Sequence, residues 1–272
     1  MNRLVLTKYT LTSLVFLLLW GCQSDTRWKF DRLIHLTGVA PVGIAIDQNA
    51  LWISDVQNNR VIKLGRDGKI IQSHDGFQRP MHLAVYRAKV YVPEYLTDTI
   101  SVIDGDTTSN LRLSEQLDAP GSVAIAENTI AVADFYNHRI ILQHNGQTTT
   151  IGYEGHGPGE LYYPTDVDLA QGMVYVADAY NNRVQVFDTD GNILRIVGER
   201  DSIQVATGLV VNQEKIYVTD FEGNRVLVYL QDSLLDQIIT DSLSSPTDIA
   251  IAEGFMYVAN YESKTIAVFK EQ

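Results

Sequence analysis

Three residues with metal-binding side chains stand at the same place in a repeated pattern of this 272-residue chain. His82, Asp166 and Asp248 each follow a proline by two positions. One imidazole and two carboxylates from separate repeats could coordinate a divalent cation such as Ca²⁺ or Zn²⁺, with water completing its shell. The alternative is that Asp166 and Asp248, both in Pro-Thr-Asp, cap turns and that His82 is an isolated polar residue.

A second set of residues in the pattern is aromatic. Five of the six repeats carry at least one ring just after the second expected strand, at Tyr95, Phe135 and Tyr136, Tyr180, Phe221 and Tyr261. Exposed together at one rim, these rings would suit a protein, peptide or glycan partner, because aromatic side chains give contact area at low entropic cost. Packed between neighbouring repeats, they would only stabilise the fold. The sequence leaves both interpretations open.

A third set consists of four Asp/Arg pairs with a constant step of five residues. The pairs are Asp55/Arg60, Asp134/Arg139, Asp178/Arg183 and Asp220/Arg225. Because a catalytic site should break a repeat and not follow it, we expect these pairs to be structural. Each carboxylate can accept bonds from turn amides, and each guanidinium can reach a carboxylate or a carbonyl of the next unit.

All these positions belong to one repeat of about 40 residues. A proline-like residue precedes an Asp-like residue by 14 positions six times, at Pro41/Asp55, Pro80/Glu94, Pro120/Asp134, Pro164/Asp178, Ala206/Asp220 and Pro246/Asn260. In the fourth repeat, alternating apolar runs cover 165–170, 173–177, 183–187 and 192–197, with turn residues between them. This period of two indicates antiparallel strands, and no window has sustained helical periodicity. The sequence therefore predicts an all-β fold, a six-bladed β-propeller of four-stranded antiparallel blades.

The two ends of the chain are expected to complete the last blade. The sixth repeat supplies only three strands, at 247–252, 255–259 and 265–269, and the chain ends at Gln272. Residues 28–36 form an alternating apolar run that has no repeat of its own. We expect this run to pair with the edge of the last blade, so that residues 28–272 form one closed ring without an open sheet edge.

The fourth repeat resembles an NHL repeat. The resemblance is carried by GYEGHGPGELYYP at 152–164, VYVAD at 174–178 and NNRV at 181–184, and it extends over residues 38–272. Repeats two and six, with VYVPEYLTDTISVID and MYVANYESKTIAVF, are more similar to the YVTN type. The resemblance implies a propeller. NHL-like propellers include protein-binding and RNA-binding modules, and relatives of the same architecture include lyases and lactone hydrolases, so the fold does not decide the function.

The N-terminus predicts secretion and attachment to lipid. Arg3 and Lys8 precede a short apolar core at 14–20, which is typical of a secretory leader. The segment Leu19-Trp20-Gly21-Cys22 resembles the lipobox of bacterial lipoproteins, and Cys22 is the only cysteine. We therefore predict a lipoprotein signal peptide at 1–21, lipidation of Cys22 and a tether at 22–27. By resemblance to the sorting rule of diderm bacteria, Gln23 favours the outer membrane. The alternative is an ordinary leader with an unmodified cysteine.

The charge of the chain and the absence of several catalytic motifs reduce the number of functions to consider. The formal charge is −12, and removal of residues 1–21 leaves 19 basic and 33 acidic residues, a charge of −14. Such a body repels a phosphate backbone, so we expect no nucleic-acid partner and membrane contact only through the N-terminal lipid. The sequence has no Gly-x-Ser-x-Gly, phosphate-binding glycine loop or His-Glu-x-x-His motif. The six His residues do not recur at one blade position, so a three-His zinc site, as in amidating lyases of this architecture, is not supported.

The sequence thus predicts a non-enzymatic binding or scaffold module for a protein, peptide or glycan, held at the bacterial cell envelope. It names no catalytic residue. The alternative is a divalent-metal-dependent lyase or hydrolase with its site in the central channel, at His82, Asp166 and Asp248. A third possibility is a structural subunit of an envelope complex.

Overall fold

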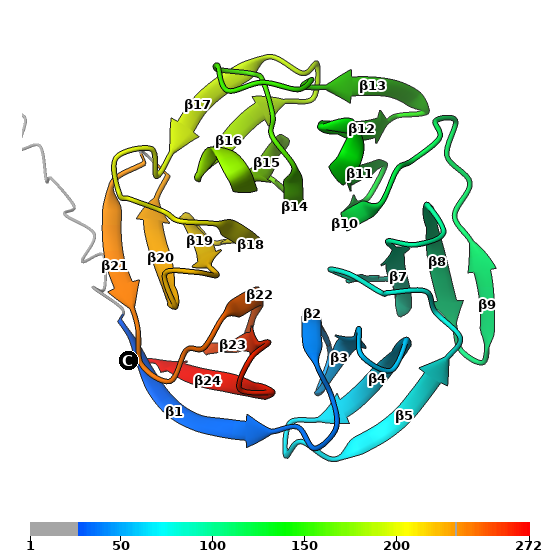
Figure 1. Cartoon of the computed structure of the whole chain (residues 1–272), viewed down its shortest axis with the longest axis vertical. Helices are drawn as coiled ribbons and strands as arrows, with labels where there is room; N and C mark the ends of the chain where they lie inside the picture. Colours follow the sequence, from blue (N-terminus) through cyan, green and yellow to red (C-terminus); the bar gives the residue numbers. More distant parts are fainter. Residues whose placement is uncertain (1–26, 232) are drawn as a thin grey trace, which may run out of the picture.

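The strands form six four-stranded antiparallel sheets that stand around a central axis (Figure 1). The computed structural model describes residues 27–231 and 233–272. Within this part of the chain, the only other regular elements are two single-turn 3-10 helices, η1 (Phe135–Asn137) and η2 (Ala179–Asn181). The predicted all-β, six-bladed propeller is confirmed. The predicted signal peptide at 1–21, Cys22 and the tether up to residue 26 lie outside the described residues.

Each blade begins with its innermost strand and continues outward. Blades one to three consist of β2 (Pro41–Asp47), β3 (Ala50–Asp55), β4 (Arg60–Gly65) and β5 (Ile70–Asp75); β6 (Ala84–Tyr86), β7 (Lys89–Glu94), β8 (Thr99–Asp104) and β9 (Thr107–Asn110); and β10 (Pro120–Ala126), β11 (Thr129–Asp134), β12 (Arg139–His144) and β13 (Gln147–Ile151). Blades four to six consist of β14 (Pro164–Ala170), β15 (Met173–Asp178), β16 (Arg183–Asp188) and β17 (Ile193–Val197); β18 (Ala206–Asn212), β19 (Lys215–Asp220), β20 (Arg225–Leu230) and β21 (Leu235–Ile239); and β22 (Pro246–Ala252), β23 (Phe255–Asn260), β24 (Thr265–Glu271) and β1 (Trp28–His35).

The last blade closes the ring as the sequence predicts. Strand β1 lies antiparallel to β24 along its whole length, from Trp28 opposite Glu271 to His35 opposite Thr265. The Trp28 indole is buried, packs edge-on against Tyr217 of blade five and donates from Nε1 to the Tyr217 hydroxyl at 3.2 Å. The first strand therefore ties blade six to blade five as well as completing blade six.

The 14-residue spacing in the sequence is the register of the first hairpin of each blade. All six proline-like residues lie opposite their Asp-like partners, for example Pro164 opposite Asp178 and Ala206 opposite Asp220. In blade two this pair is an isolated bridge, because β6 has only three residues. Two-residue turns follow, and in the fourth blade Gln171 and Gly172 adopt φ of 52° and 73°, the left-handed conformation that tight hairpins need.

The four Asp/Arg pairs are structural, as expected. In each pair the arginine Nε donates to Asp Oδ2 at 2.8 or 2.9 Å, and the aspartate has no exposed surface. The other carboxylate oxygen accepts an amide N–H of the loop that leads into the same blade, as from Tyr162 to Asp178 at 2.7 Å. Glu94 and Asn260 accept the equivalent bond in blades two and six. These side chains hold the entry to each innermost strand in place.

The hydrophobic core lies between neighbouring blades. One cluster joins blade one, through Leu51 and Ile62, to blade six, through Tyr257 and Ile266. Another joins blades three and four, and a third joins blades four and five. Because apolar side chains from both neighbouring blades fill the space between them, the innermost strands are held close around the axis. None of the described residues forms a helix of the length and hydropathy needed to cross a membrane.

Candidate functional site

The innermost strands approach one another so closely that glycine is required at some positions. A Cβ added to Gly208 of β18 would lie 2.5 Å from the carbonyl oxygen of Thr247 in the next blade, and one added to Gly43 would lie 2.5 Å from the carbonyl oxygen of Met81. The strands are also bonded to one another directly, as where the His82 amide donates to the carbonyl of Gly121 at 3.1 Å. The position two residues after each proline therefore lies on the wall of a narrow central channel.

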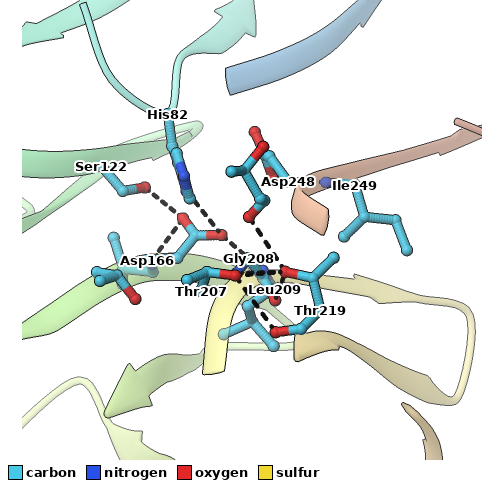
Figure 2. Close-up of polar contacts among 12 residues, drawn as sticks. His82, Ser122, Asp166, Thr207, Gly208, Leu209, Thr219, Asp248 and Ile249 are labelled. Carbon is cyan, nitrogen blue, oxygen red and sulfur yellow. Dashed lines mark hydrogen bonds and ion pairs between the residues drawn. The ribbon is translucent and has the colours of Figure 1, made fainter. Parts of the chain in front are cut away.

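His82, Asp166 and Asp248 converge at this level of the channel (Figure 2). Their nearest nitrogen and oxygen atoms all lie within 4.8 Å of one another, and each residue is no more than 5% exposed. His82 Nδ1 is 3.6 Å from Asp166 Oδ2, too far for a hydrogen bond, and it has no hydrogen-bond partner although it is buried. The structure thus brings together the three residues that the sequence analysis proposed as metal ligands.

Both carboxylates are fixed by backbone amides from two blades. Asp166 accepts from Val167 at 2.9 Å and from Leu209 of the next blade at 2.6 Å. Asp248 accepts from its own neighbour Ile249 at 2.7 Å and from Ile44 of blade one at 2.8 Å. These bonds support the structural alternative, in which the carboxylates join blades. They leave lone pairs unused on both carboxylates, so the structural role and metal binding are compatible.

The three side chains perturb one another's protonation. Burial opposes a charged imidazole, but the carboxylates of Asp248 and Asp166 outweigh it and raise the pKa of His82 to about 9. Burial raises the pKa of Asp248 to about 7, although His82 counteracts it. Near neutral pH the cluster therefore holds a proton on His82. A metal ion bound through this imidazole would have to displace that proton.

On one side of this level the channel continues into a cavity of about 280 Å³ with three aspartates in its wall, which we call the vestibule. Its wall includes Ser122, Asp166, Asp168 and Asp248. Burial raises the pKa of Asp168 to about 6, while backbone bonds from Val211 and Leu169 act in the opposite direction. Asp168 repeats the bonding pattern of Asp166 one step further along β14, without contributing to the three-residue cluster.

At the other end the channel opens into a cavity of about 680 Å³ whose wall is largely aromatic, which we call the cup. The cup contains every aromatic residue that the sequence analysis placed at a rim, namely Tyr95, Phe135, Tyr136, Tyr180, Phe221 and Tyr261. Tyr180 is 56% exposed and Tyr136 is 48% exposed, so these rings are not buried between blades. His82 lies at the floor of the cup and also borders the vestibule. The candidate metal site and the aromatic binding surface that the sequence predicts are therefore two parts of one channel.

The rings of the cup are gathered on blades two to four. Tyr95 donates its hydroxyl to that of Tyr136 at 2.6 Å, and Phe135 packs against Tyr163 with ring centroids 4.9 Å apart. Tyr163 in turn lies 5.3 Å from Tyr180. Blades five and six contribute only two rings to the lining, Phe221 and Tyr261, beside smaller or polar residues such as Val205, Thr207 and Glu222. The cup is therefore asymmetric, with a continuous aromatic wall on one side.

Sequence reasoning missed two residues of this wall, Tyr163 and Arg79. Each directly precedes the proline of its repeat, Pro164 or Pro80, and each adopts a positive φ, 52° for Tyr163 and 57° for Arg79. The Arg79 guanidinium lies over the Tyr95 ring at 4.5 Å from its centroid. Extending the alignment of the six repeats by one residue toward the N-terminus would have included this position. Of the six residues at this position only Arg79, Tyr163 and Val205 line the cup, so the alignment alone would not have identified them.

The fold and the repeat define a six-bladed β-propeller that contains an NHL repeat. The family model of the NHL repeat matches residues 161–187, which include β14 and β15. A comparison with curated proteins found no match. The wider NHL resemblance over residues 38–272 and the YVTN-like character of repeats two and six stay predictions.

Solved structures with this fold include enzymes and a binding protein. A gluconolactonase from Xanthomonas campestris is 14% identical with a TM-score of 0.73, over 92% of this chain and 91% of that chain. Virginiamycin B lyase from Staphylococcus aureus, solved with quinupristin, is 17% identical with a TM-score of 0.67, over 90% and 88%. A nidogen/laminin complex contains a chain that is 15% identical with a TM-score of 0.67, over 79% and 86%. At these identities the similarity concerns the fold alone.

Proposed function

We propose that this protein is a binding propeller that holds an apolar segment of a protein or peptide in the cup. The observation that carries the proposal is the gathering of partly exposed rings from five blades around one cavity. Exposed aromatic side chains on a rigid scaffold lose little entropy on binding and bury much area. A closed ring of six interlocked blades is such a scaffold.

The lining of the cup favours a polypeptide over a glycan. Three threonine hydroxyls at its floor already donate to carbonyls of the next blade, as from Thr207 to Pro246 at 3.0 Å. The hydroxyls of Tyr95 and Tyr136 are bonded to each other. These hydroxyls are therefore not free to donate to a sugar at the floor of the cup, where a desolvated, unpaired sugar hydroxyl would cost about 1–3 kcal/mol. The polar groups of Arg79, Glu222 and the remaining tyrosines lie elsewhere in the lining.

We place this activity at the bacterial cell envelope, with the chain anchored by lipid on Cys22 in the outer membrane. The support is the sequence of the leader, with one cysteine directly after Gly21. Mass spectrometry of the membrane-extracted protein should find diacylglycerol on Cys22, and Cys22→Ser should release the protein from the membrane fraction. An unmodified Cys22 in extracted protein would contradict the anchor.

Tyr180→Ala tests the binding proposal. The probes are a random-peptide display library and a glycan array, both applied to the purified protein. We expect peptides to be selected and to bind the variant at least about tenfold more weakly, because exposed tyrosines often supply more than 1 kcal/mol of binding. Tyr153→Ala is the matched control, since Tyr153 is 65% exposed and lies outside the cup. Selection of glycans alone, or equal loss in both variants, would contradict the proposal.

A second candidate function is a metal-dependent lyase or hydrolase. The observation that favours it is the orphaned, buried His82 Nδ1 beside two carboxylates at the floor of the cup. One nitrogen and two carboxylate oxygens form a donor set suited to a divalent cation such as Zn²⁺ or Ca²⁺. A bound cation would supply Lewis-acid activation or an activated water. The lyase and gluconolactonase among the similar structures make this a reasonable alternative.

The metal is tested by elemental analysis and by calorimetry with Zn²⁺ or Ca²⁺ alone. We expect Asp166→Asn to lower the affinity for the cation at least about tenfold, because it removes a charged ligand. Asp168→Asn is the matched control, since Asp168 makes the same two backbone bonds but lies outside the cluster. No binding by the unaltered protein, or equal losses in both variants, would rule the metal site out.

A further inference from the structure

The outer edge of the ring is not uniform from blade to blade. The outermost strands of blades two and three, β9 and β13, expose threonine, serine, asparagine and glutamine. The neighbouring outer strands β21, β1 and β5 instead expose large apolar side chains, at Leu235, Ile238, Phe30, Ile70 and Ile71. These three strands follow one another around blades five, six and one (Figure 1). Outside this arc, the described outer strands expose one side chain of this kind, Leu194 of β17.

Basic residues are found along the same arc. Lys29 and Arg32 are exposed on β1, Lys270 is exposed on the adjacent β24, and Lys69 immediately precedes β5. Some of them have acidic neighbours, since Arg32 pairs with Asp31 and Lys69 with Asp67. Neither β9 nor β13 contains a lysine or an arginine. The same three strands also carry Asp31, Asp75 and Asp236, so the charges along the arc nearly cancel. In a protein with a charge of −14 after removal of the leader, an anionic surface therefore repels this arc far less than the molecule as a whole.

The chain also enters the ring at this arc. The Arg27 amide donates to the carbonyl of Gln272 at 3.1 Å, and its guanidinium donates to the carbonyl of Asp236 in β21 at 2.8 Å. Cys22 precedes Arg27 by five residues. Five extended residues reach at most about 18 Å. A lipid on Cys22 would therefore keep β21 and β1 within about that distance of the membrane surface.

From these observations we propose that the arc formed by β21, β1 and β5 lies on the phospholipid surface, so that the ring stands edge-on to the membrane. This rests on the lipid anchor proposed above. Exposed apolar side chains insert into the boundary between head groups and acyl chains, and nearby lysines and arginines contact anionic head groups. The arc needs only a weak affinity, because the tether already holds it at a high local concentration. In this orientation both the cup and the vestibule open sideways into water.

The test uses the full chain, processed and lipidated in a bacterium, with one cysteine introduced for a fluorescent label. Because Cys22 is the only native cysteine and its thiol is consumed by lipidation, Ile238→Cys supplies a single reactive thiol. Ser109→Cys, on the polar strand β9, is the matched control. The purified proteins are inserted into vesicles of phosphatidylethanolamine and phosphatidylglycerol that contain lipids with a nitroxide near the head group.

We expect the label at 238 to be quenched at least about twofold more than the label at 109, because only the former would lie at the lipid boundary. Ile71→Cys should resemble Ile238→Cys, since it lies on the other flank of the arc. Equal quenching at 238 and 109, in protein whose Cys22 carries lipid by mass spectrometry, would overturn the edge-on contact and leave the anchor intact. Shielding of 238 in native membranes but not in vesicles would show that a protein covers the arc. A Cys22 without lipid would overturn the anchor and this inference together.

Discussion

At the scale of single residues, two aspartates of one strand differ in what they can do, according to their place along the channel. Asp166 and Asp168 each accept one amide of their own strand and one of β18, yet only Asp166 faces His82 and Asp248. The difference arises because the two aspartates lie at different levels of the channel, two residues apart along β14. A bridging carboxylate becomes a candidate ligand only where another blade brings a histidine opposite it.

Asp178 offers a residue-scale test of the repeated ion pair. It is fully buried and bonded to Arg183, whose side chain is 5% exposed. Asp178→Asn should lower the free energy of unfolding by about 3–5 kcal/mol, because it removes the buried counter-charge of a buried guanidinium and leaves only the exposed carboxylate of Glu199, 3.9 Å away. The measurement is urea unfolding followed by tryptophan fluorescence and circular dichroism.

The sixth blade provides the control for this change. There Asn260 and Thr265 occupy the same two positions and bond to each other at 3.1 Å. The double variant Asp178→Asn with Arg183→Thr recreates that neutral pair, and we expect it to be more stable than Asp178→Asn alone. A double variant that is less stable than the single one would show that the arginine contributes through its carbonyl contacts and not through the pair.

At the scale of elements, the first strand decides whether the ring is closed. Strand β1 is separated from its partner β24 by the whole of the chain, so its pairing depends on long-range contacts alone. Trp28 anchors it, through packing against Tyr217 and through backbone contacts with the side chain of Gln237 in β21. Near the other end Ile34, 6% exposed, packs into the core between blades one and six. A strand held by two buried side chains is sensitive to loss of the larger one.

Trp28→Ala should therefore lower the free energy of unfolding by about 3–5 kcal/mol, the cost typical of removing a buried tryptophan. Hydrogen exchange should show faster exchange of the β1 and β24 amides than in the unaltered protein. Phe30→Ala on the same strand is the control, because Phe30 is 39% exposed and should cost much less. Equal effects of the two variants would mean that the strand is held by its backbone ladder and not by Trp28.

At the scale of the whole molecule, the width of the channel is set by how closely the six innermost strands approach. Gly208 lies where the backbone of blade six comes nearest to blade five. Gly208→Ala would place a Cβ 2.5 Å from the Thr247 carbonyl oxygen and 2.7 Å from the Asp248 Cα, so one blade must move outward.

We expect Gly208→Ala to destabilise the ring by about 1–3 kcal/mol or more, as overpacking of a close contact does. It should also weaken any cation bound near Asp248, because the displaced backbone carries a ligand. Differential scanning calorimetry with and without Zn²⁺ measures both effects. Gly65→Ala is the control, since its added Cβ would come closer than 3 Å only to the end of the Asp67 side chain and would meet no backbone atom of another blade. A Gly208→Ala protein as stable as Gly65→Ala would contradict this account of the channel.

The repeat made the fold and much of the site predictable. Because each blade repeats one hairpin register, aligning six prolines with six acidic or amide residues located the innermost strands, the channel position of His82 and the ring position of Tyr180. The alignment could not reveal that Tyr163 and Arg79 belong to the same wall, because only some of the residues at that repeat position line the cup. Nor could it show that the aromatic rings and the His82 cluster share one channel.

The sequence by itself determined the number of blades and the strand register, because these follow from local alternation and a repeat of nearly constant length. It also predicted closure of the ring by residues 28–36, because the last repeat lacks a fourth strand and this run has no repeat of its own. Only the tertiary structure decided which residues of different blades meet across the axis. His82, Asp166 and Asp248 meet because blades two, four and six face one another across a channel narrowed by glycine contacts. The distances between side chains of different blades depend on how the six blades close around the axis, and no local pattern in the sequence specifies them.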